Sequence, residues 1–141
     1  MFNRILESLE NFCIHQIRQE HKVCENIENL RTIIASIDLT TNDGTTNRVY
    51  LAVEKNFAQK IAQVLLEEDE SDDETLVDMV LESANLVVGS AKVLLSEKDA
   101  IVCSISTPTL HKQECFEMSY DRANSIKIQN DSVIVAIKEI D

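Results

Sequence analysis

The sequence predicts an α/β fold of the α+β type, with a long helix and two further helices packed on an antiparallel sheet of about five or six strands. Apolar residues recur at helical spacing in three stretches, and they alternate with polar residues in the segments between and after these stretches. The chain has 141 residues, of which 44% are hydrophobic, so it is long enough to bury a sizeable core. We therefore expect a single domain over residues 1–141.

The first two helices and a hairpin are predicted in the N-terminal half of the chain. An amphipathic helix is expected from residue 2 to about residue 20, and a shorter helix from Asn56 to about Glu67. Between them lie two alternating segments, joined by a turn that contains Asp43-Gly44, a pair typical of hairpins. The apolar positions of these two strands are Ile33, Ala35, Ile37 and Leu39, followed by Val49, Leu51 and Val53.

The long helix is predicted over residues 71 to about 96. Its first residues read SDDE, which matches a capping box in which Ser71 caps the helix and Glu74 reaches back to it. Acidic residues in the first turn also suit the positive end of the helix dipole.

The last third of the chain alternates in the manner of strands. Pro108 follows the first of these strands, and its missing N–H suits the end of a strand. The expected strands are residues 101–105, 116–120, 126–128 and 133–137.

The net charge of −12 excludes several kinds of partner. Binding to nucleic acid or to an anionic membrane requires a surface rich in Lys and Arg. In this chain the acidic residues outnumber the basic ones, 25 to 13. We see no apolar run of membrane-spanning length and no signal-peptide pattern, so we expect a cytoplasmic protein. Residues 67–74 read EEDESDDE. This run is best interpreted as a solvated linker, and a docking surface for a basic partner is the alternative.

The four cysteines show no CxxC pairing and are best interpreted as small, mostly buried hydrophobic residues. A metal cluster of Cys13, His15, His21 and Cys24 is the alternative. It is disfavoured because Cys13 and His15 would point to different sides of a helix. We therefore expect no metal and no cofactor bound by this chain.

A polar stripe follows one face of the long helix. Asp78, Glu82 and Asn85 are four and three residues apart, which places them on a single face of an otherwise apolar helix. The stripe continues through Gly89, Lys92 and Ser96. A polar group buried without a partner is costly, so the stripe must meet solvent, an internal hydrogen-bond partner or another protein.

Gly89 interrupts the helical pattern, because glycine in a helix interior costs about 1 kcal/mol relative to alanine. Two interpretations stay open. A neighbouring element packs closely against Gly89, or the missing side chain keeps space free beside Asn85.

These residues carry a resemblance to a known family. Asp78, Glu82, Asn85 and Pro108 read D-x3-E-x2-N-x22-P, the signature of the CheX, CheC and FliY group of chemotaxis phosphatases. The order of expected elements is similar to that of the CheX type. CheC-type proteins generally carry two copies of the motif, and this chain has one, which favours a CheX-like domain.

The resemblance implies a function and a role for each residue. The substrate would be the phosphoaspartate of a CheY-like response regulator, whose own Mg²⁺ and lysine stabilise the transferring phosphoryl group. Asn85 would orient the attacking water, since a carboxamide both donates and accepts hydrogen bonds. Glu82 would bind the regulator's active-site lysine. Asp78 and Pro108 would support the helix and the adjoining strand end, and a homodimer is implied.

Two other interpretations stay open. One is a noncatalytic regulator-binding or flagellar-switch adaptor of the same fold, which needs neither Glu82 nor Asn85. The other is a structural interaction domain whose polar stripe finds its partners within the molecule.

Overall fold

A computed structural model describes residues 1–18, 20–24 and 31–140 of the chain. It contains the α-helices α1 (Phe2–Asn11), α2 (Lys55–Leu66) and α3 (Asp73–Asp99), and a π-helical segment, η1 (Phe12–Ile17), that continues α1. The strands are β1 (Lys22–Cys24), β2 (Arg31–Thr41), β3 (Thr46–Glu54), β4 (Cys103–Ile105), β5 (Thr109–Cys115), β6 (Arg122–Ile128) and β7 (Asp131–Glu139).

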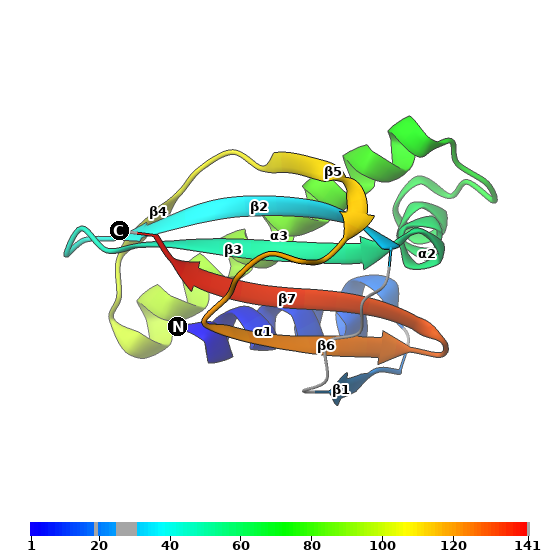
Figure 1. The fold of residues 1–141 in the computed structure, drawn as a ribbon. Helices are drawn as coiled ribbons and strands as arrows, with labels where there is room; N and C mark the ends of the chain where they lie inside the picture. The colour runs from blue at the N-terminus through cyan, green and yellow to red at the C-terminus, as the bar shows by residue number, and fades with distance from the viewer. Residues whose placement is uncertain (19, 25–30, 141) are drawn as a thin grey trace.

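All seven strands belong to one antiparallel sheet in the order β1-β6-β7-β3-β2-β4, and β5 also pairs with β2. The three helices lie on one face of the sheet, whereas the connection from β5 to β6 crosses the opposite face (Figure 1). The predicted fold class is therefore confirmed. The sheet has seven strands, slightly more than the expected five or six, and neither β1 nor β5 was predicted. β1 has only three residues, which is too short to show periodicity.

The predicted hairpin is confirmed as β2 and β3, with Ile37 opposite Val49 and Leu39 opposite Asn47. Its odd-numbered apolar residues face the helices and join the main core. Gly44 has a φ of 91°, a conformation that favours glycine, and this explains the Asp43-Gly44 turn.

The second face of the sheet is covered by residues 116–120, which were predicted as a strand. That prediction is wrong, because the strand that pairs with β2 is β5, which ends at Cys115. Phe116 is buried against Tyr50 with ring centroids 5.9 Å apart, and Met118 packs beside it. The alternation at 116, 118 and 120 thus comes from a covering segment that inserts apolar side chains into the face of the sheet.

The N-terminal helix was predicted to extend to about residue 20. The helical segment ends earlier, at Ile17, where Arg18 adopts the left-handed conformation with φ of 61°. Its apolar stripe packs on the sheet as expected, with Ile5, Leu9 and Phe12 buried.

Asp72 rather than Ser71 caps α3. The Asp72 side chain accepts a hydrogen bond of 2.9 Å from the backbone N–H of Thr75. Ser71 is buried, its Oγ donates to Glu68 and its N–H donates to Gln59. The predicted capping box is therefore wrong by one residue, because the Ser71 hydroxyl instead ties the α2–α3 connection together.

By length and composition alone, α3 could cross a membrane. The core helix of a globular domain passes the same test, and α3 packs its buried face on the sheet and on α1 and α2. Its opposite face carries the charged residues Asp78, Glu82 and Lys92, all of which are exposed.

We predict that Asp72→Ala lowers the melting temperature, because it removes the cap of the longest helix. The hydrogen bond from Thr75 lowers the pKa of Asp72 in the folded chain. The cap therefore stabilises fully above the pKa of an unfolded aspartate, about 3.9, and loses its effect as the pH falls through the lower folded pKa.

Thermal unfolding followed by circular dichroism between pH 3 and pH 7 measures this effect. The control is Asp72→Asn, which keeps a capping oxygen and should melt close to the parent at pH 7. Equal melting of parent and Asp72→Ala at pH 7 would contradict the assignment of the cap.

Candidate functional site

The polar stripe of α3 lies on the surface of the domain. Asp78, Glu82 and Asn85 are all exposed, and the opposite side of the same helix is buried. Within residues 1–18, 20–24 and 31–140, none of their three side chains makes a hydrogen bond or an ion pair. The interpretation in which the stripe pairs internally therefore lacks the partners that it requires.

The packing of α3 holds this stripe in a fixed position. Leu76, Val80 and Leu95 are fully buried, and the helix contacts α1, α2 and the strands β2, β3 and β4. Inside the helix, Ser83 donates a 2.7 Å hydrogen bond to the carbonyl of Met79, so its buried hydroxyl is satisfied. A site on a packed helix is held more precisely than one on a loop.

The side chains of the stripe define what chemistry is available. Glu82 offers a carboxylate with free acceptor positions, and Asn85, three residues later, offers a neutral amide that can donate and accept. No group of three His, Cys, Asp or Glu residues in the described part of the chain could hold a metal ion. The stripe can bind a cation and orient a polar molecule.

Pro108 occupies the connection between β4 and β5, directly before β5 begins, and it is half-buried. Both of these strands contact α3. Pro108 thus lies at the start of a strand that contacts α3.

Gly89 lies on the exposed side of α3, one turn beyond Asn85. A Cβ atom at Gly89 would meet no atom within 4 Å, and its φ is not in the left-handed range. The interpretation in which a neighbouring element packs closely against Gly89 is therefore wrong, and the surface beside Asn85 is open.

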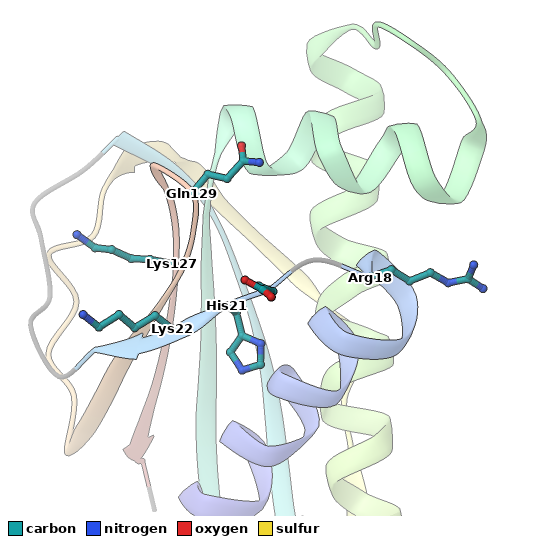
Figure 2. Close-up of a pocket in the computed structure, with 6 residues that line it drawn as sticks. Arg18, His21, Lys22, Lys127 and Gln129 are labelled. Carbon is teal, nitrogen blue, oxygen red and sulfur yellow. The ribbon is translucent and has the colours of Figure 1, made fainter.

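Another cavity, with a volume of about 690 Å³, lies around the end of η1 and the strands β1 and β6. Lys22 and Lys127 face each other in the β1–β6 register, and Figure 2 shows them extending to the side opposite Arg18. His21 lines this cavity, and its Nε2 lies 3.0 Å from Oε1 of Glu10. None of the stripe residues lines this cavity.

The alternative metal cluster of Cys13, His15, His21 and Cys24 is not assembled. Cys13 is fully buried, and this burial raises the pKa of its thiol to about 12. His15 is exposed, as expected for residues two apart on a helix. Cys13 therefore stays a neutral thiol within the core, and Cys103 is also buried.

The three-helix layer, the antiparallel sheet and the exposed D-x3-E-x2-N stripe form an α+β domain that resembles the chemotaxis phosphatases. A scan against models of protein families matches residues 33–131 to the family described as chemotaxis phosphatase CheX. The chain belongs to the CheX family, as its motif predicted.

Solved structures share the fold over almost the whole chain. The CheX protein of Vibrio vulnificus is 21% identical with a TM-score of 0.80, and the match covers 98% of this chain and 97% of that one. The CheX–CheY–BeF3–Mg²⁺ complex from Borrelia burgdorferi matches at 18% identity and a TM-score of 0.71, with 98% and 97% covered. Thermotoga maritima FliY matches at 15% identity and a TM-score of 0.59, covering 96% and 84%. A search of curated proteins by sequence finds no match.

We predict that Gly89→Ala raises the free energy of unfolding by about 0.5–1 kcal/mol, because alanine is the better helix former and the added methyl group meets open space. Urea denaturation measures the change. A lower free energy of unfolding in Gly89→Ala would contradict the open environment of this residue.

Proposed function

We propose that this chain dephosphorylates the phosphoaspartate of a CheY-like response regulator in chemotaxis signalling. One observation carries the proposal: Glu82 and Asn85 stand exposed and unpartnered, among the described residues, on a rigid helix at the spacing of the CheX motif. A solvated pair without internal partners is available to another protein, and the family to which the chain belongs is that of a phosphatase.

The chemistry required of this chain is small, because an acyl phosphate is already labile. A water molecule attacks phosphorus in line with the leaving carboxylate, the bond from phosphorus to the aspartate oxygen breaks, and the products are inorganic phosphate and a free aspartate. Asn85 would hold that water through hydrogen bonds to its amide. Its role is orientation, since an amide is not a base near pH 7.

Glu82 would fix the register of docking. Its exposed carboxylate, one helical turn before Asn85, suits a charge-assisted bond to the regulator's active-site lysine. Asp78 would extend the docking surface by a further turn, and Pro108 would shape the start of β5 near α3. Neither of the latter two would touch the reacting atoms.

The setting of the reaction belongs to the same proposal. Mg²⁺ would be held by the regulator, and this chain would bind no cofactor of its own. The protein would act in the cytoplasm as a homodimer. The solved complex of a CheX protein with CheY, on a fold shared with this chain, supports a CheY-type partner.

A noncatalytic adaptor role is the alternative, since a flagellar protein shares this fold. The FliM middle domain from Vibrio alginolyticus matches this chain with a TM-score of 0.55 at 6% identity. An adaptor would bind a regulator without accelerating its dephosphorylation, so turnover separates the two functions.

We predict that Asn85→Ala lowers the turnover number by about 10²-fold, because the attacking water loses its orientation, while the fold is unchanged. The measurement is loss of phosphate from a phosphorylated CheY-type regulator in the presence of Mg²⁺. Asn42→Ala, the same change at an exposed asparagine in the turn between β2 and β3, is the control and should keep full turnover. Undiminished turnover in Asn85→Ala would remove the water-orienting role.

Glu82→Gln should act on binding as well as on turnover. The amide keeps the size of the side chain but loses the charge that the regulator's lysine would meet, so we expect the dissociation constant to rise about tenfold or more at low salt. Calorimetric titration of the regulator into each variant measures it. An unchanged dissociation constant with no dependence on salt would contradict the proposed ion pair.

A further inference from the structure

A second hollow lies directly beside the polar stripe, between α1–η1 and α3, and has a volume of about 230 Å³. From α1 and η1 it is lined by Ser8, Asn11, Phe12, His15 and Gln16, and from α3 by Leu86 and Ser90. We call it the α1–α3 groove. Leu86 follows Glu82 by four residues and Ser90 follows Leu86 by four, so both lie on the side of α3 next to Glu82.

The lining of the α1–α3 groove contains no Asp, Glu, Lys or Arg side chain. It combines two amides, two hydroxyls and an apolar surface made by Phe12 and by Leu86, which is 39% exposed. The groove therefore lacks the acidic side chains that give the whole chain its net charge of −12. It suits a segment that offers main-chain hydrogen-bonding groups and an apolar side chain, rather than a cluster of charges.

Ser8 provides an independent indication of a ligand. It lines the groove and is 2% exposed, and within the described residues its Oγ is the buried side-chain polar atom that has no hydrogen-bond partner. Leaving a buried hydroxyl unsatisfied is unfavourable, and native structures seldom do so without a reason. This Oγ is sealed from solvent in the unbound chain, so the Ser8 side chain would have to rotate toward the groove before a carbonyl or amide of a bound chain could satisfy it.

Docking of a folded regulator needs more surface than the stripe provides. A specific protein–protein interface buries about 800 Å² on each partner, which corresponds to some 20–30 residues a side. Asp78, Glu82 and Asn85 supply only three. The interface must therefore extend across the neighbouring surface of α3, and the α1–α3 groove adjoins the stripe on the side of Glu82.

We propose that the α1–α3 groove receives an uncharged loop of the docked response regulator and determines which regulator the site accepts. The loop would place an apolar side chain on Phe12 and Leu86 and direct main-chain groups to Asn11, Gln16 and Ser8. The groove residues position the substrate and do not touch the phosphoryl group. This inference rests on the proposed function, since it requires a regulator bound at the stripe.

The test uses the full-length chain and a phosphorylated CheY-type regulator of the same organism. Leu86→Lys places a charge in the groove without altering Glu82 or Asn85, and burying that charge under a loop is costly. We expect KM to rise about tenfold and kcat to stay within about twofold of the parent. The matched control is Val64→Lys on α2, where the parent residue is 42% exposed, and it should leave both parameters unchanged.

Ser8→Ala is the second variant, and it separates docking from folding. Removing an unpaired buried hydroxyl should leave the melting temperature unchanged or raise it. Loss of its bond to the loop should still raise KM severalfold.

The outcomes are distinguishable. Unchanged KM in both variants, with the parent active, would overturn the groove and leave the phosphatase intact. A parent that binds the regulator without turnover would overturn the proposed phosphatase, and the dissociation constants of the same variants would then test the groove. A change in oligomeric state of Leu86→Lys, measured by sedimentation, would show that a second copy of the chain occupies the groove and would overturn its assignment to the regulator.

Discussion

The packing of α3 on the sheet is the interaction on which the rest of this structure depends. One side of this 27-residue helix is buried against the β-sheet and against α1 and α2, with Leu76, Val80, Ala91 and Leu95 fully excluded from solvent. Burying those side chains removes apolar surface from water, and each Å² buried stabilises the fold by about 25 cal/mol. The same packing leaves one face of α3 exposed, and the residues of that face carry the proposed function.

The exposed face combines fixed geometry with unsatisfied polar groups. A side chain with an internal partner would have to break that hydrogen bond before it could bind a regulator. Glu82 and Asn85 would give up only their hydrogen bonds to water. Because the helix is held from three sides, the spacing between carboxylate and amide changes little on docking. The domain thus presents a preformed surface, in which the charged stripe and the uncharged α1–α3 groove meet different parts of a partner.

Local patterns in the sequence predicted most of the fold, for reasons visible in particular elements. The period-2 pattern of β2 and β3 arises because one face of each strand meets the helices, and Gly44 at φ 91° allows the turn between them. The same rule failed at residues 116–120, because an apolar segment lying across a sheet can alternate as a strand does. The helix is capped by Asp72 and not by Ser71, because the Ser71 hydroxyl already donates a hydrogen bond to Glu68. The backbone N–H of Ser71 donates to Gln59.

The candidate site was predictable in part. Helical spacing placed Asp78, Glu82 and Asn85 on one face, and the motif that they form with Pro108 indicated the family. No sequence pattern could show that these side chains lack internal partners, since that depends on what packs around the helix. The groove was missed for the same reason: Ser8 and Leu86 are 78 positions apart in sequence, and only the packing of α1 on α3 brings them together.

The measurement that tests the central claim most directly is catalytic turnover by the unmodified chain. A phosphorylated CheY-type regulator would be mixed with Mg²⁺ and with this protein at about one-hundredth of the regulator concentration, and phosphate release would be followed with time. The account predicts that each molecule clears many phosphoryl groups, so that release far exceeds the amount of protein added. Release at the regulator's own spontaneous rate, while binding of the two proteins is detected, would contradict it.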